Sequence, residues 1–198
     1  VFREKSVDVK EDIESNIHLR DMPSMTMPLG YTVSYSKEYV EQKDMINLKK
    51  SYLEKAKEIE KFNAFTSLTE ERALARAQEI DEKISKGEKV GELAGVPFVA
   101  KDNFLVIGSP STASSKMLEN FETPIQATAV EKLEEAGAIC IGKSNLDAFA
   151  HGGSTENSAF GVTKNSVDEA RVAGGSSGGS AVITALDVVP FALGTDTG

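Results

Sequence analysis

Apolar residues recur along the chain at two spacings, and these spacings predict its helices and strands. A period of three to four residues is typical of a helix with one buried face, while short apolar runs are typical of buried strands. The expected helices cover residues 38–61, 69–86, 128–137, 145–149 and 176–186. The expected strands cover residues 96–100, 138–142 and 190–194. We expect Thr69 to cap the second helix and Gly87 to end it.

Strands alternate with helices after residue 91, and this order predicts an α/β fold with a mostly parallel sheet covered by helices. Residues 1–37 are polar, mixed in composition and without a sustained period. We therefore expect a tail or linker there, and a folded domain over residues 38–198.

Composition excludes several functional classes. Hydrophobic residues make up 40% and charged residues 27% of the 198 residues, as in globular proteins. The net charge of −9 disfavours direct nucleic-acid binding, because phosphate contacts require clustered Lys and Arg. The apolar runs are too short to span a bilayer. A single cysteine, Cys140, and two histidines predict neither a disulfide framework nor a metal site, and they fit a reducing compartment.

The two ends of the chain predict a fragment. Position 1 is Val rather than Met, and the chain stops after Asp196-Thr197-Gly198. The alternative is a processed or trimmed protein.

Lys101 follows the predicted strand 96–100 directly, at the position where α/β folds build their sites. Burial disfavours the charged form of a lysine and lowers its pKa, so that the amine becomes a base near neutral pH. Most lysines are solvated surface residues, so this position by itself does not assign a function.

A segment rich in glycine and serine, Gly174 to Ser180, runs without a break into a core-like apolar stretch. A flexible linker has this composition. The apolar continuation instead favours glycines that allow tight backbone geometry and close approach to a ligand or helix. A phosphate-binding loop is disfavoured, because the Lys and Ser/Thr that end such loops are missing.

Two further segments are polar. The loop 152–161 is explained equally well as a plain connection and as part of a site. The terminal run from Thr195 to Gly198 contains the Asp-Thr-Gly of aspartic proteases, but the other segments do not belong to that family.

Together these segments resemble the amidase signature family. Lys101-Asp102-Asn103, then Gly174 to Ser180, then Asp-Thr-Gly follow one another in the order of that family, over roughly residues 62–198. Further segments resemble the A subunits of tRNA-dependent amidotransferases: Phe62 to Phe65, Leu93 to Pro97, Gly137 to Ile139 with Gly142-Lys143, and Ser154 to Gly161. The resemblance implies the amidase-signature fold, with a mixed, mostly parallel sheet, of which residues 38–198 would form the N-terminal part.

The resemblance also implies a Ser-Ser-Lys triad. Lys101 would be the terminal base. Ser176, on a cis peptide, would relay the proton between this lysine and a nucleophilic serine just beyond Gly198. Backbone N–H groups near Thr197 and Gly198 would help to form the oxyanion hole, and Ala150 would lie near the acyl group.

Four positions depart from the pattern of the family. Val162, Ser166 and Ala173 stand where prolines are common, and His151 stands where methionine is usual. These changes loosen loop geometry without removing chemistry. We interpret His151 as a residue that lines the site rather than as a catalytic base.

The activity implied is that of a glutaminase subunit, which hydrolyses glutamine and supplies ammonia for transamidation of misacylated Glu-tRNA(Gln) or Asp-tRNA(Asn). The implied partners are the B and C subunits, which would contact the tRNA, and the partner rather than this chain would use ATP and Mg. We expect a cytoplasmic location without membrane contact. The alternatives are a stand-alone amidase on small amides and an inactive binding or scaffold fragment. Residues 2–4 and 14–16 faintly resemble a C-subunit tail, so a fused C–A arrangement is a further hypothesis.

Overall fold

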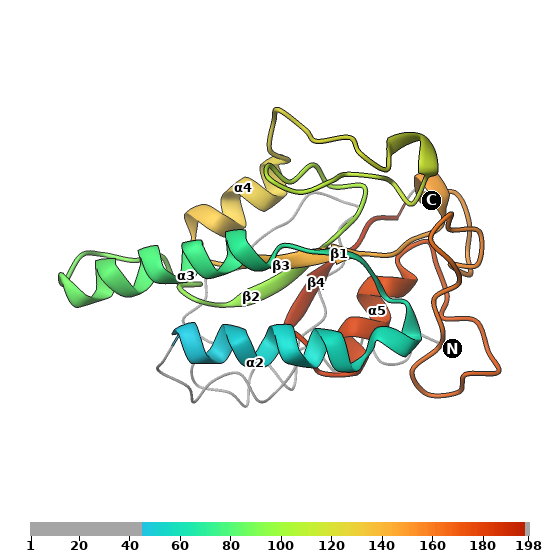
Figure 1. Cartoon of the computed structure of the whole chain (residues 1–198), viewed down its shortest axis with the longest axis horizontal. Coiled ribbons are helices and arrows are strands. Elements are labelled where there is room, and N and C mark those ends of the chain that lie inside the picture. Colours follow the sequence, from blue (N-terminus) through green and yellow to red (C-terminus); the bar gives the residue numbers. More distant parts are fainter. Residues whose placement is uncertain (1–44, 197–198) are drawn as a thin grey trace.

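The computed structural model describes residues 45–196, and four strands in this range form one sheet in the order β1-β3-β2-β4 (Figure 1). The strands are β1 (Phe65–Leu68), β2 (Pro97–Lys101), β3 (Ile139–Ser144) and β4 (Phe191–Leu193). β2 runs parallel to both of its neighbours, β3 and β4, whereas β1 pairs antiparallel with β3. The mixed, mostly parallel sheet predicted from the sequence is therefore confirmed.

Helices cover both faces of this sheet. They are α2 (Met45–Glu58), α3 (Glu70–Ser85), α4 (Thr128–Glu135) and α5 (Gly178–Ala185), with short 3-10 turns η2 (Glu60–Phe62), η3 (Lys116–Leu118) and η4 (Ala148–Ala150). Figure 1 shows α2 and α5 on one side of the sheet and α4 on the other.

The sheet divides the core into two clusters of buried apolar residues. One cluster joins α2, α3 and α5 to the face of β2 that carries Val99. The other joins α4 to the face that carries Phe98 and Ala100. Every residue of β2 is buried, as expected for a strand covered on both faces. Successive side chains of β2 therefore enter two different environments.

Local details differ from the sequence prediction. Strand β1 was not predicted, because its four residues are all half-buried and so lack the alternation of a surface strand. The helix expected over 145–149 is wrong: the chain forms a single 3-10 turn, since Phe149 adopts a positive φ of 54°. The helix expected from Ser176 begins at Gly178. Thr69 does precede α3, but its hydroxyl donates to Cys140 O at 2.9 Å instead of capping the helix.

Several predicted features lie outside the described residues. They are the tail 1–37, the first part of the helix expected from residue 38, and the predicted oxyanion-hole residues Thr197 and Gly198. Within residues 45–196, no helix has both the length and the apolar character needed to cross a membrane.

Candidate active site

The C-terminal ends of β2 and β3 carry two buried lysines on opposite faces of the sheet. Lys101 pairs with Ser144 across the two strands, while the preceding residue, Ala100, pairs with Lys143. Paired residues of adjacent strands point to the same face of the sheet, while consecutive residues of one strand point to opposite faces. Lys101 and Lys143 therefore lie on opposite faces. Ser144 Oγ lies 2.6 Å from Ser180 Oγ of α5, so Lys101 is on the α5 side of the sheet. Both lysines are 0% exposed.

Hydroxyl groups surround the amine of Lys101. Its Nζ lies 2.7 Å from Ser176 Oγ, 2.9 Å from Ser177 Oγ and 2.8 Å from Thr195 Oγ1. Asn103 Nδ2 donates to the same threonine hydroxyl at 3.1 Å and fixes its position. Three segments far apart in the sequence therefore meet at one amine: the end of β2, the glycine-rich segment and the end of β4.

The two serines beside Lys101 differ in their remaining contacts. Ser177 Oγ donates to Thr195 O at 3.1 Å and accepts from Thr195 N at 3.2 Å, so its hydroxyl is already hydrogen-bonded to the backbone. Ser176 Oγ has Lys101 Nζ as its one hydrogen-bond partner among residues 45–196. Ser176 therefore has the hydroxyl that remains available for proton transfer. The peptide bond between Gly175 and Ser176 is cis.

The surroundings of Lys101 lower its pKa from 10.5 to about 8. Burial is the largest cause, because desolvation disfavours the ammonium form. The negative charges of Asp147 and Asp196 act in the opposite direction and raise this pKa. A substantial fraction of Lys101 is therefore neutral near physiological pH, and a neutral amine accepts a proton from a hydroxyl.

Close packing explains the glycines around Ser176. A Cβ on Gly175 would come within 2.1 Å of Asp147 Oδ2, and one on Gly178 within 2.3 Å of Thr155 Oγ1. Thr155 Oγ1 donates to Gly174 O at 2.8 Å and accepts from Gly178 N at 3.1 Å. The glycines thus let this segment lie directly against the loop 147–155, in agreement with close approach and against a flexible linker.

On the other face of the sheet, Lys143 forms a buried ion pair. Its Nζ lies 2.7 Å from Asp102 Oδ1, and both side chains are 0% exposed. Asp102 also accepts hydrogen bonds from the backbone N–H and the hydroxyl of Thr112. Lys143 donates further to Pro110 O and Ser111 Oγ, each at 3.2 Å. Among the described residues, Lys143 therefore has an ion-pair partner and Lys101 has none.

The other residues named from the sequence lie in η4 and after it. Ala150 is buried, has a positive φ of 59° and donates its N–H to Asp147 O at 2.8 Å. His151 follows it and is exposed. The sequence prediction assigned no role to Asn103, Ser177, Thr195 or Asp147. Asn103 and Thr195 belong to the motif segments, so the motifs were a signal for them, whereas no motif indicated Asp147.

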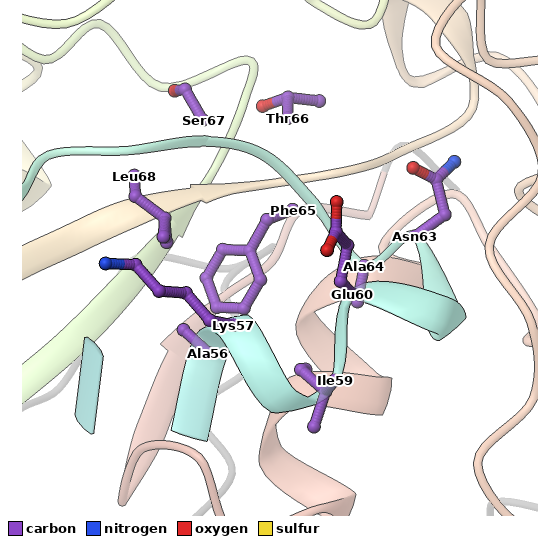
Figure 2. A pocket seen from close by; sticks show the side chains of 10 residues that line it. All are labelled: Ala56, Lys57, Ile59, Glu60, Asn63, Ala64, Phe65, Thr66, Ser67 and Leu68. Atoms are coloured by element: carbon purple, nitrogen blue, oxygen red, sulfur yellow. The ribbon is translucent and has the colours of Figure 1, made fainter. Parts of the chain in front are cut away.

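A cavity of about 330 Å³ lies elsewhere, beside the end of α2, η2 and the edge strand β1 (Figure 2). Its lining runs from Ala56 to Leu68 and contains none of the residues around Lys101. Within the described part of the chain, no three His, Cys, Asp or Glu side chains gather to hold a metal ion.

Comparison with known proteins gives consistent matches. The Amidase family matches residues 47–198. The A subunit of glutamyl-tRNA(Gln) amidotransferase from Thermoanaerobacter pseudethanolicus is 52% identical over 170 residues, which cover 84% of this chain and 35% of that protein. The structure of the corresponding A subunit from Thermotoga maritima matches with a TM-score of 0.63 and 39% identity, over 76% of this chain and 30% of that one. Peptide amidase from Stenotrophomonas maltophilia matches with a TM-score of 0.70 and 31% identity, over 76% and 32% of the two chains. The chain thus spans about a third of the length of the relatives that it matches.

Proposed function

Because the chain belongs to the amidase family, we propose that it is the N-terminal part of a glutaminase subunit of a tRNA-dependent amidotransferase. The observation that carries this proposal is the buried amine of Lys101, which lies 2.7 Å from a serine hydroxyl and has a pKa of about 8. Relatives of about 50% identity that are named as amidotransferase A subunits support the choice of substrate.

In the proposed reaction, Lys101 and Ser176 move protons and a further serine attacks. The attacking serine would lie beyond Gly198. Its proton passes to Ser176 Oγ while the proton of Ser176 passes to Lys101 Nζ. The same route in reverse delivers a proton to the leaving nitrogen of the tetrahedral intermediate, whose C–N bond then breaks, so that ammonia departs and the acyl-enzyme remains. Water then releases glutamate. Backbone N–H groups of Thr197 and Gly198 would stabilise the oxyanion, with Ala150 near the acyl group.

The B and C subunits would receive the ammonia and contact the tRNA, and ATP and Mg would be used by the partner. The amidotransferase formed by these subunits would act in the cytoplasm.

The test uses the full-length protein that contains this sequence, assayed for ammonia released from glutamine with and without the partner subunits. We expect activity that rises with the partners. Lys101→Met and Ser176→Ala should each lower kcat by about 10²–10⁴-fold, the usual range for a general base. Lys83→Met is the matched control, because Lys83 lies on exposed α3 surface, and it should leave kcat unchanged. If Lys101→Met still releases ammonia from glutamine at the wild-type rate, Lys101 is not the base of the reaction.

A stand-alone amidase is the second candidate, favoured by the structural match to a peptide amidase at a TM-score of 0.70. It predicts hydrolysis of small amides at a rate that is indifferent to the partner subunits. No hydrolysis of glutamine or of small amides by the full-length protein would favour the scaffold alternative.

A further inference from the structure

Two buried carboxylates accompany the buried lysines, and only one of them has an ion-pair partner among residues 45–196. Asp102 is 0% exposed and is paired with Lys143 at 2.7 Å. Asp147 is 1% exposed, and no lysine or arginine of the described residues forms an ion pair with it. A buried carboxylate without a paired cation is costly, so its position requires an explanation.

Backbone N–H groups hold one oxygen of Asp147. Oδ2 accepts hydrogen bonds from Ser154 N at 3.1 Å and Thr155 N at 2.9 Å. Oδ1 is buried and has no hydrogen-bond partner among the described residues. These contacts fix the orientation of the carboxylate while leaving its charge without a direct counter-ion.

Asp147 also contacts the backbone that carries Ser176. Its own N–H donates to Ser176 O at 3.1 Å. On the preceding residue, a Cβ added to Gly175 would lie 2.1 Å from Asp147 Oδ2, so the carboxylate touches that backbone directly. The main chain and the side chain of Asp147 therefore hold the two residues that place the Ser176 hydroxyl at Lys101.

The charge of Asp147 reaches the lysine as well. Asp147 and Asp196 are the acidic groups whose field raises the pKa of Lys101, against the effect of burial. The direct contacts of Lys101 are neutral, since Ser176, Ser177 and Thr195 present hydroxyls to it. The remaining nearby carboxylate, Asp102, is neutralised by Lys143.

We propose that Asp147 is a positioning residue for the Lys101–Ser176 pair, anchoring Ser176 through the backbone and supplying the buried negative charge that balances Lys101 when it is protonated. This inference rests on the proposed function. In each proton transfer Lys101 becomes an ammonium ion in a buried site, where a fixed opposite charge is worth more than in water. In this role the carboxylate acts through Lys101 and Ser176.

The experiment compares Asp147→Asn and Asp147→Ala in the full-length protein. Asparagine keeps an oxygen for the two backbone N–H groups and places its amide nitrogen where Oδ1 has no partner, so it removes mainly the charge. Alanine removes the charge together with the side-chain contacts to Ser154 N and Thr155 N, and it keeps the backbone N–H that donates to Ser176 O. Asp187→Asn is the matched control, because Asp187 is exposed and has a positive φ of 52°, which asparagine tolerates.

One readout does not depend on activity. The protein is labelled with [ε-¹³C]lysine, the Lys101 signal is assigned by its loss in Lys101→Met, and its titration is followed by NMR. In Asp147→Asn we expect the midpoint to move down by about half a unit or more, since an opposite charge has been removed. Asp187→Asn should leave it in place. An unchanged or raised midpoint in Asp147→Asn overturns the proposal.

The second readout is the pH profile of glutamine hydrolysis. In Asp147→Asn, the acidic limb of the kcat/KM profile should move to lower pH together with the midpoint of the Lys101 titration. In Asp147→Ala, kcat should fall about 10-fold or more with KM little changed. A purely structural role would lower the melting temperature without moving the limb, and this result would also overturn the proposal. If the wild-type protein hydrolyses no glutamine, the proposed function fails, while the NMR titration still decides the role of Asp147.

Discussion

Replacing Lys143 by methionine should destabilise the fold strongly although it leaves Lys101 untouched. The substitution keeps a chain of similar length but removes the ammonium that lies 2.7 Å from Asp102 Oδ1, where both side chains are 0% exposed. Asp102 then keeps its bonds from Thr112 but loses its cation. Removing one partner of a buried ion pair lowers the free energy of unfolding by about 3–5 kcal/mol, because the other partner is left as an uncompensated buried charge.

A double-mutant cycle separates this charge effect from lost packing. Asp102→Asn should also destabilise, since it leaves Lys143 without its acidic partner. In the double variant neither charge remains, so the cost should be smaller than the sum of the single costs by about 2 kcal/mol or more. The free energy of unfolding is measured by urea titration of the full-length protein, with the slope checked for constancy. The surface pair Lys83–Glu79 at 2.9 Å is the control, and Lys83→Met should cost less than about 1 kcal/mol.

Two results would contradict a desolvated Asp102–Lys143 pair. Single variants within about 1 kcal/mol of the wild type would mean that the pair is not desolvated as the structure indicates. Strict additivity in the double variant would mean that Asp102 and Lys143 do not act as a pair.

Three other predictions follow from the same structure. Lys101 has a pKa of about 8 against an ordinary value of 10.5. Between these two pH values the unfolded chain therefore binds more protons than the folded chain. Stability should therefore rise with pH from about 8 to 10.5 by about 3 kcal/mol, and urea titrations of Lys101→Met should lack this slope. Gly175→Ala should lower the melting temperature and kcat because its Cβ would meet Asp147 Oδ2 at 2.1 Å, whereas Gly153→Ala, with nothing within 4 Å, should change neither. Arg72→Lys should cost about 1 kcal/mol in urea unfolding, because it replaces a two-bond contact to Glu134, at 2.6 and 2.8 Å, by a single one, and an unchanged midpoint would show that the second bond contributes nothing.

The sequence predicted the fold class, and the resemblance to the amidase signature family named Lys101 and Ser176 as candidate site residues. Lys101 follows an apolar run, and Ser176 lies in a glycine-rich segment that continues into a buried helix, so both positions have a signal in the neighbouring residues. Their meeting at 2.7 Å depends on which strands are neighbours, and periodicity alone does not determine this. No local pattern in the sequence indicates that β2 and β4 lie side by side.

The contacts that Thr195 and Asp147 make could not be predicted from the sequence, because they depend on strand pairing and on an unusual turn. Thr195 reaches Lys101 from 94 residues away because β4 is parallel to β2 and ends beside it. Asp147 lies in a stretch that was expected to be helical, and a helix would have directed its side chain elsewhere. Its role depends on a turn with positive φ at Phe149 and Ala150, a conformation that non-glycine residues rarely signal in a sequence.

The two buried lysines show how partners, more than burial, decide what a residue does. Both follow apolar strand residues and both are 0% exposed. The register that pairs Ala100 with Lys143 sends them to opposite faces, where their neighbours differ. Lys143 meets the Asp102 carboxylate at 2.7 Å and forms a buried ion pair with it. Lys101 meets hydroxyls at a similar distance, and hydroxyls stabilise a neutral amine as well as a charged one. A slip of one residue between β2 and β3 would put both lysines on one face of the sheet, so the register of the two strands keeps the ion-paired lysine apart from the lysine beside the hydroxyls.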